Sequence, residues 1–376
     1  MADATADGPR VLRFLYHSVN WLCQPALFWT VLLAAFFSAL AFRKFLVKRA
    51  VASSVLAGAL VFAALSAFSP QFVKEAAKPD YLLLWAMLFL TGLCLWSAFC
   101  QAVRNDERLK QGLPPEEAAA AQENVHVWPY LLYLEAIVAA FAMAILLVWA
   151  LGLDAPLEQP ANPADSPNPA KAPWYFVGLQ ELLVYFDPWI GGVLLPVMTI
   201  TGLACLPYCD PDPAGAGYFS FERRKYSITM YLFGFLLLWV AMICTGAFLR
   251  GPDWNSFGLF EPWSAPKAAP ANTINLSQFF WQDVMNWLTG RPRALDSLHW
   301  FKRELPGFLV VAAYFLGLPV LGARLFRNLY GQLGWLRYCI VAFHLLVMLA
   351  VPIKICLRLV FNLKYIIFVP EFFFDV

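Results

Sequence analysis

Long apolar runs alternate with short polar segments along this chain. A helix needs about 20 mostly apolar residues to cross the hydrocarbon core of a bilayer, and runs near that length predict about eight membrane spans. They lie at residues 26–42, 50–68, 81–103, 129–151, 189–209, 227–249, 306–326 and 338–360. Residues 10–22 have the mixed pattern of an amphipathic helix at the membrane surface. The fold class that follows is an all-α polytopic membrane protein.

Composition supports this class. Hydrophobic residues make up 61% of the chain, charged residues make up 14%, and the mean hydropathy is +0.61. An ordinary soluble domain has about 25% charged residues. The net charge of +2 gives no reason to expect a nucleic acid as a partner, whereas membrane lipids are expected. The first ten residues lack the basic start of a signal peptide, so the first span is expected to stay in the mature protein.

Positive charge between the predicted spans gives an orientation. Lys and Arg cluster at 43–49, 104–110, 223–225 and 324–337, all on one side of an eight-span arrangement. Basic loops face the cytoplasm, so the acidic loop at 152–188 is expected to face outward. This arrangement suits the inner (cytoplasmic) membrane of a bacterium. The basic residues that disagree with it are Arg10, Arg13, Lys354, Arg358 and Lys364.

The order of spans and polar segments predicts five blocks. They are a three-helix membrane block at 1–103, a cytoplasmic linker at 104–128, a membrane domain at 129–250, an outward interfacial segment at 251–305 and a two-helix block at 306–376. The Trp- and Phe-rich interfacial segment is a candidate docking surface for a peripheral subunit. No repeat of fixed period is visible, which argues against a transporter built from inverted repeats.

The loop inside the third membrane block carries the most distinctive pattern. A Pro- and Asp-rich stretch ends at Pro173-Trp174-Tyr175-Phe176, and an apolar, helix-like stretch with Glu181 follows. Long loops of defined composition are usually functional. Aromatic side chains at a membrane interface are also common as anchors, which is the alternative interpretation.

These motifs resemble the C-terminal domain of cytochrome b, also found as subunit IV of cytochrome b-f complexes. The order is VWPYLLYLEAIV, an outward loop with NPAD and then PWYF, a Gly-Gly span ending in LPYCDP, and a further span. The family carries Pro-Glu-Trp-Tyr at its quinol-oxidation site. The block at 129–250 is therefore interpreted as a cytochrome b C-terminal-like domain.

The resemblance implies a function in respiratory or photosynthetic electron transport. The chain would be a membrane subunit of a cytochrome bc-type quinol:cytochrome c (or other acceptor) oxidoreductase. Pro173, Trp174, Tyr175 and Phe176 would form part of its outer quinol-oxidation site, with quinone or quinol bound at an interface between subunits. The complex, and not this chain alone, would be the enzyme.

One departure from the family changes the expected proton chemistry. Pro173 stands where the family has Glu, and Ala172 stands where it has Pro. Glu181 is the nearest carboxylate downstream and, seven residues after Trp174, shares its helix face. The hypothesis is that Glu181 accepts the quinol proton; the alternative is that it faces the aqueous edge of a helix.

Histidine content places the haems elsewhere. Two haems b need four axial histidines in facing pairs, and this chain has only His17, His126, His299 and His344, with no two in one predicted span. Haem b is therefore expected only in a partner that resembles the N-terminal half of cytochrome b. An iron–sulfur or c-type cytochrome subunit would take the electrons. No metal site is predicted, because Cys205 and Cys209 have no further ligand.

Two other functions stay open. The chain is an anchor or assembly subunit with a vestigial quinol site if the missing Glu has no substitute. A transporter would need broken helices and charged groups at mid-membrane, and the sequence shows neither. Lys354, Arg358 and Lys364, near the last span's outer end, are expected to reach lipid phosphates. The alternative for them is a partner's haem propionates or a cardiolipin head group.

Overall fold

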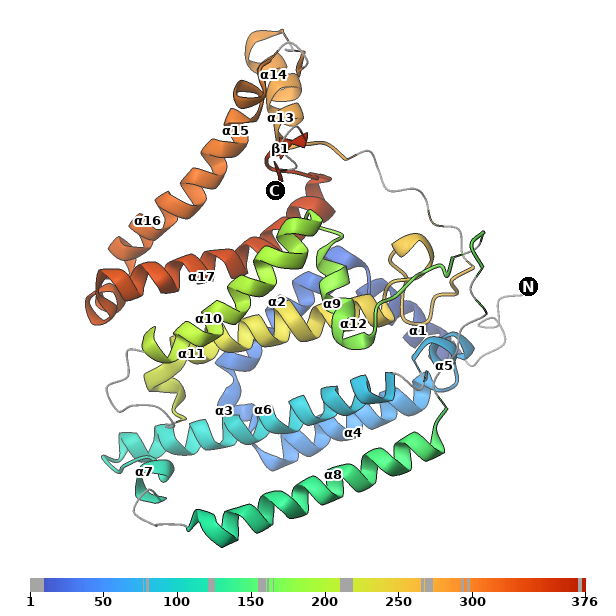
Figure 1. Ribbon diagram of the computed structural model, residues 1–376, viewed down its shortest axis with the longest axis vertical. Helices are drawn as coiled ribbons and strands as arrows, with labels where there is room; N and C mark the ends of the chain where they lie inside the picture. Colours follow the sequence, from blue (N-terminus) through green and yellow to red (C-terminus); the bar gives the residue numbers. More distant parts are fainter. Residues whose placement is uncertain are drawn as a thin grey trace. The chain divides into compact units, whose positions relative to one another are not determined.

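The computed structural model describes most of the chain. The described residues are 10–76, 78, 81–120, 126–154, 160, 162–164, 166–209, 219–264, 267, 273–291, 294–295, 298–370 and 374–376. This part is almost entirely helical, and its strands are the short antiparallel pair β1 (Phe368–Val369) and β2 (Phe374–Asp375). Figure 1 shows the order of the helices along the chain. The predicted all-α class is confirmed.

The candidate membrane spans agree closely with those predicted. Within the described residues, seven helices are long and apolar enough to cross a membrane. They are Arg49–Ser66, Tyr81–Lys110, Val127–Gly152, Ile190–Cys209, Phe221–Phe248, Trp300–Leu325 and Arg327–Phe361. An eighth candidate is the bent pair α1 (Arg10–Leu22) and α2 (Pro25–Ala41), which meet at 86°. The predicted span at 26–42 corresponds to α2, whose 17 residues are too few to pass alone.

Two compact units divide the chain, and they interleave in the sequence. Unit 1 comprises Met1–Arg13, Ala39–Pro167 and Asp212–Lys225, and unit 2 comprises Phe14–Ser38, Asn168–Pro211 and Tyr226–Val376. These units do not follow the five sequential blocks expected from the sequence, whose boundaries stay predictions. The division is possible because helices from separate stretches of chain pack together.

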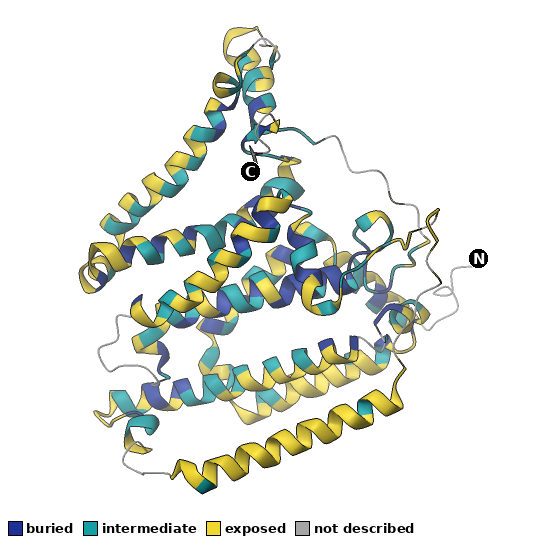
Figure 2. Cartoon of the chain, viewed as in Figure 1, coloured by how far each residue is buried: buried dark blue, intermediate teal, exposed yellow. Residues whose placement is uncertain are grey.

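Unit 1 is built from long apolar helices with few buried residues. Its helices are α3 (Arg43–Leu46), α4 (Arg49–Ser66), α5 (Pro70–Ala76), α6 (Tyr81–Lys110), α7 (Glu116–Ala120), η1 (Val127–Leu131) and α8 (Leu132–Gly152). No residue of α8 is buried, and Figure 2 shows it exposed along nearly its whole length. Apolar side chains on such a helix suit contact with lipid or with other apolar helices.

A buried polar node lies at the end of α6. Asn105 Nδ2 donates to Glu117 Oε2 at 2.7 Å, and Asp106 Oδ1 accepts from Ser220 Oγ at 2.7 Å and from the Glu222 amide at 3.1 Å. Asn105 and Asp106 are both buried. The region predicted as an exposed linker, 104–128, therefore begins inside α6 with two buried polar residues. The node ties α6 to α7 and to the start of α11 (Phe221–Leu232).

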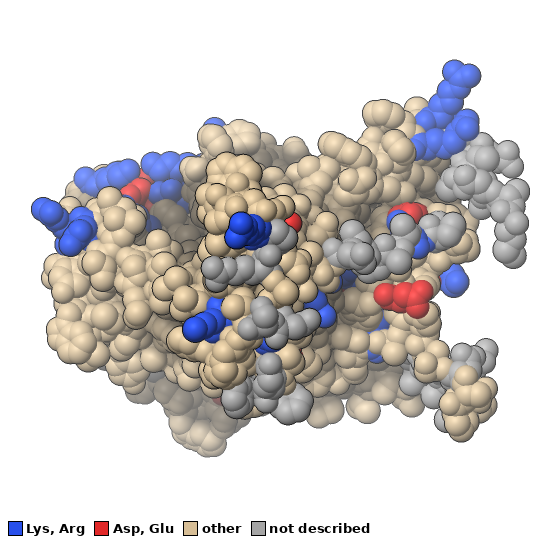
Figure 3. Space-filling view, turned by 90° about the horizontal axis from the view of Figure 1, so that it is seen from above, with Lys and Arg blue, Asp and Glu red and all other residues tan. Residues whose placement is uncertain are grey.

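Unit 2 carries the larger apolar core. Besides α1 and α2 it contains α9 (Trp174–Leu182), η2 (Ile190–Leu194), α10 (Leu195–Cys209), most of α11 (Phe221–Leu232), η3 (Phe233–Val240), α12 (Ala241–Phe248), η4 (Pro252–Trp254), α13 (Leu276–Gln278), η5 (Phe279–Val284), α14 (Met285–Thr289), α15 (Trp300–Ala312), η7 (Ala313–Gly317), α16 (Leu318–Leu325) and α17 (Arg327–Phe361). Figure 3 shows that few atoms on the face drawn there belong to charged residues.

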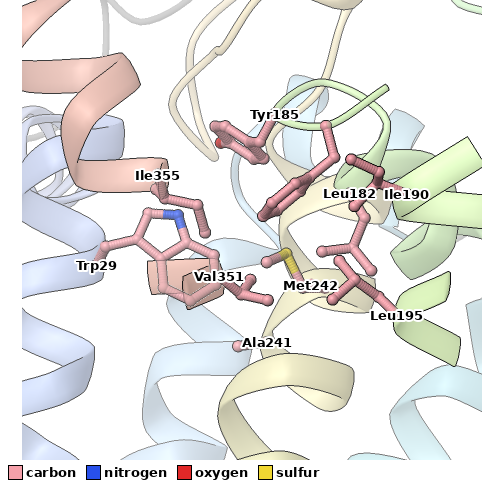
Figure 4. Close-up of a cluster of buried hydrophobic side chains, with 10 residues drawn as sticks. Trp29, Leu182, Tyr185, Ile190, Leu195, Ala241, Met242, Val351 and Ile355 are labelled. Carbon is pink, nitrogen blue, oxygen red and sulfur yellow. The ribbon is translucent and has the colours of Figure 1, made fainter. Parts of the chain in front are cut away.

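The core of unit 2 fixes the position of the short helix α9. Its buried members are Trp29, Leu182, Tyr185, Phe186, Ile190, Leu195, Ala241, Met242, Val351 and Ile355. They come from α2, α9 and the turn after it, η2, α10, α12 and α17, and Figure 4 shows nine of them converging. Because Leu182, the last residue of α9, is buried in this core, close packing holds the end of the helix in place.

Candidate functional site

The segment that carries the distinctive motif forms α9. Pro173 precedes the helix, and its carbonyl accepts from the amides of Phe176 and Val177 at 2.8 and 3.0 Å. The loop in front of Pro173 is tied back to the helix by Gln180. Its Oε1 accepts from the Ala172 amide, and its Nε2 donates to the Ala170 carbonyl, both at 2.8 Å. These bonds fix the direction in which the helix leaves the loop.

Two glycines let α9 approach α12 closely. A Cβ placed on Gly178 would lie 2.9 Å from Ile243 Cγ1, and one placed on Gly246 would lie 2.9 Å from the Val177 carbonyl oxygen. Real Cβ atoms essentially never approach other atoms this closely. Glycine at both positions therefore brings the two helices into backbone contact, with Val177 and Gly178 buried between them.

Glu181 forms a buried ion pair. Its side chain is fully buried, and its Oε1 and Oε2 accept from Arg250 Nη2 and Nε at 2.6 and 2.8 Å. The Tyr185 hydroxyl lies 3.1 Å from both Glu181 Oε1 and Arg250 Nη2. Arg250 Nη1 donates to the Trp254 carbonyl and to Ser256 Oγ, both at 2.9 Å. A bidentate pair with its remaining donors satisfied is the arrangement that a buried charge requires.

The electrostatics keep this centre charged. Burial lowers the pKa of Arg250, but its hydrogen bond with Glu181 and the negative charge of that carboxylate outweigh burial, so the pKa is raised. Burial, and then the charge of Glu181, raise the pKa of Tyr185, which therefore remains a neutral phenol. The centre is thus a guanidinium–carboxylate pair with a neutral hydrogen-bonding hydroxyl.

The predicted aromatic residues lie in the first turn of α9, where two of the three side chains are exposed. Tyr175 and Phe176 are 47% and 54% exposed, Pro173 is exposed, and Trp174 is half-buried. The ring centroids of Trp174 and Tyr175 are 5.7 Å apart, and those of Tyr175 and Phe176 are 4.8 Å apart. Trp174, Tyr175 and Phe176 therefore form one aromatic face at the start of α9, directly after Pro173. The structure places Glu181 on the buried side of the same helix.

The loop before α9 is fixed to the segment that follows α12. Lys171 Nζ donates to the Ala247 carbonyl at 2.7 Å. Asn168 Nδ2 donates to Asp253 Oδ1 at 2.8 Å, and Asn168 Oδ1 accepts from the Asp253 amide at 2.7 Å. Asp165, the last residue of the NPAD motif, lies outside the described residues. The aromatic face is thus supported both from the loop and from α12.

Arg250 and Tyr185 are the residues of this centre that the sequence reasoning missed. A signal for Arg250 was present, because it is a single cation that directly follows the apolar span 227–249. A charge in that position usually has a partner. Its partner is 69 residues away in sequence, so no local pattern identifies it.

The fold and this site define a polytopic helical membrane protein with a clamped, aromatic-faced helix between two spans. Residues 160–249 match the family model described as Cytochrome b(C-terminal)/b6/petD, which confirms the resemblance inferred from the motifs. The matched segment contains α9, α10, α11 and α12 and ends one residue before Arg250. No match was found among curated proteins or solved structures.

The family implies that quinone and haem take part in the complex. Within the described residues, no group of three or more His, Cys, Asp or Glu side chains is arranged to hold a metal ion. His299 caps α15 by accepting from the Phe301 amide, and His344 Nδ1 lies 2.8 Å from the Ile340 carbonyl oxygen. These two histidines lie on different helices, and each makes a local hydrogen-bond contact in the sequence.

Proposed function

We propose that this chain is a haem-free membrane subunit of a cytochrome bc-type quinol oxidoreductase that forms part of the outer quinol-oxidation site. One observation carries the proposal. In the segment that matches the family, exposed Tyr175 and Phe176 and half-buried Trp174 lie at the start of a helix whose end is clamped by packing and by an ion pair. Exposed rings on a fixed helix can form one wall of a binding site, and a partner subunit would supply the other wall that encloses the substrate.

Each motif residue has a distinct part in this proposal. Trp174 and Tyr175 shape the site, and Phe176 packs against the quinol ring, since offset and edge contacts between rings are favourable. Pro173 sets the start of the helix and supplies no proton acceptor. The ring face is the part of the family's site that this chain retains.

Glu181 would accept a quinol proton, on the condition that one of its oxygens leaves Arg250. A carboxylate can accept a proton, but both oxygens of Glu181 are held by Arg250. Protonation requires one oxygen to leave the guanidinium, while the Tyr185 hydroxyl, which already donates to Oε1 at 3.1 Å, can keep its contact. The proton would leave toward the outside of the membrane.

The remaining components follow from what the chain lacks. The sequence has four histidines, no two of which lie in one predicted span, and this pattern supports haem b in a partner resembling the N-terminal half of cytochrome b. Electrons would pass to that partner and to an iron–sulfur or c-type cytochrome subunit. The complex would lie in a bacterial inner membrane with α9 on the outer side, as the loop charges predict.

A second function is favoured by two observations. Pro173 replaces the family's Glu, and Glu181 is already engaged in a structural pair. Both suit an anchor or assembly subunit in which the quinol site is vestigial. The charge pattern gives the transporter alternative no comparable support.

The test uses the intact purified complex. Trp174→Ala and Tyr175→Ala are expected to lower quinol turnover by about tenfold or more while the subunit composition stays the same, because ring contacts position the substrate. Glu181→Gln is expected to shift the pH profile of turnover. Normal turnover in both aromatic variants would favour the anchor function, and an unchanged pH profile in Glu181→Gln would remove Glu181 as acceptor.

A further inference from the structure

Two cations near the end of α17 have unused hydrogen-bonding capacity. Lys354 is only 2% exposed, and its Nζ has no hydrogen-bond partner among the described residues. Arg358 Nη1 is likewise buried and without a partner there. The two residues are four apart, so they lie on one face of the helix. Arg358 is half-buried, so part of it is accessible one helical turn after the buried Lys354.

Their surroundings offer only weak compensation. The Lys354 ammonium lies 5.9 Å from the Phe186 ring centroid and 5.6 Å from that of Tyr365. Ring contacts of this kind offset a small part of the cost of burying a charge. Asp187 and Asp375 belong to the same unit, but no ion pair between either carboxylate and Lys354 or Arg358 is formed among the described residues. A buried ammonium of this kind calls for a counter-charge.

We propose that Lys354 and Arg358 bind the phosphate of an anionic phospholipid head group. A guanidinium and an ammonium on adjacent helical turns match the several oxygens of one phosphate. The same helix exposes Ile353, Val360 and Phe361 by 43%, 56% and 63%, which provides an apolar surface for the acyl chains. A phospholipid bound there would pair its phosphate with the two cations and pack its acyl chains against the apolar face of the helix.

This site uses none of the residues of the proposed quinol site. Lys354 and Arg358 come after residue 249 in the sequence, where the family match ends, although the Lys354 ammonium lies near Phe186, the neighbour of Tyr185. The test therefore measures bound lipid directly and does not depend on quinol turnover. Inorganic phosphate and a carboxylate group of a partner subunit present related charges, so the experiment must distinguish them from lipid.

The test measures lipid retained by the purified complex and its response to added lipid. Native mass spectrometry counts bound phospholipid in the natural protein, Lys354→Met, Arg358→Gln and the matched control Lys110→Gln, whose lysine is exposed and lies in the predicted cytoplasmic linker. A basic residue near the membrane surface contributes about fivefold to the binding of anionic lipid. Bound phosphatidylglycerol is expected to fall by about that factor or more in the first two variants only.

Melting temperatures show whether a loss of bound lipid is caused by misfolding of the variant. Lys354→Met removes a buried charge, so the lipid-free variant is expected to melt no lower than the natural complex. Phosphatidylglycerol in vesicles should raise the melting temperature of the natural complex and not that of the variant. Equal protection by inorganic phosphate, equal loss of lipid in Lys110→Gln, or unchanged lipid in Lys354→Met would each overturn the proposal. A lipid-independent loss of the partner subunit in Lys354→Met would identify a partner carboxylate instead, and would also overturn it.

Discussion

Two buried carboxylates in this protein do different work. Asp106, in unit 1, accepts hydrogen bonds at Oδ1 from two neutral donors, while its Oδ2 has no hydrogen bond within the described residues and lies 3.8 Å from Arg43. Glu181, in unit 2, has both oxygens engaged by Arg250. The first joins loops to a helix end, and the second clamps one helix. Burial alone therefore does not identify a functional acid, because the hydrogen-bond partners of a buried carboxylate decide what it does.

The largest expected effect comes from breaking the Glu181 clamp. Arg250→Ala leaves a buried carboxylate without its counter-charge and is expected to destabilise the protein by about 3–5 kcal/mol. Thermal unfolding of the purified complex, together with the yield of assembled subunit, measures this. Arg104→Ala is the matched control, because that arginine is 61% exposed and its contact with Glu116 is at 3.5 Å. Equal losses in the two variants would contradict the clamp.

A second effect tests the close contact of α9 with α12. Gly178→Val inserts side-chain atoms where even a Cβ would lie 2.9 Å from Ile243. Overpacking of this kind costs about 1–3 kcal/mol. Gly92→Ala in α6 is the control: its Cβ meets nothing within 4 Å, so it should stabilise slightly as alanine favours a helix. Unfolding midpoints in denaturant report both, and a neutral Gly178→Val would mean that the helices are not in contact.

The polar node of unit 1 should respond more mildly to loss of charge. Asp106→Asn keeps an acceptor for Ser220 and Glu222 and loses only the attraction of Arg43, so a cost of about 1 kcal/mol is expected. Glu181→Gln, which leaves Arg250 with a neutral partner, should cost clearly more in the same melting experiment. If Asp106→Asn proved the more damaging change, the contrast between the two carboxylates would be wrong.

The smallest effect on stability belongs to the exposed aromatic face. Tyr175→Ala and Phe176→Ala remove side chains that are about half exposed, and exposed substitutions usually change stability by no more than about 0.5 kcal/mol. Melting temperatures close to that of the natural complex are expected. A large drop in either variant would show that this face is a packing surface covered in the assembled complex.

The sequence predicted the elements of this fold better than their contacts. Apolar runs located the spans because a membrane requires helices of fixed minimum length. The motif at Pro173–Phe176 located α9 and its aromatic face. The partnership of Glu181 with Arg250 was not predictable, because it joins residues far apart in the chain through packing of α9 on α12. Asn105 and Asp106 look like the start of a polar linker for the same reason: their partners come later in the chain.

Photoaffinity labelling with an azido-quinone tests directly whether the start of α9 contacts quinol. The purified complex is irradiated with the probe, and the modified residues are mapped by mass spectrometry. If α9 lines the quinol site, the 173–182 peptide is labelled at Trp174, Tyr175 or Phe176, and excess quinol suppresses the labelling. Quinol-protected labelling confined to other subunits, with none on this peptide, would contradict that role of α9.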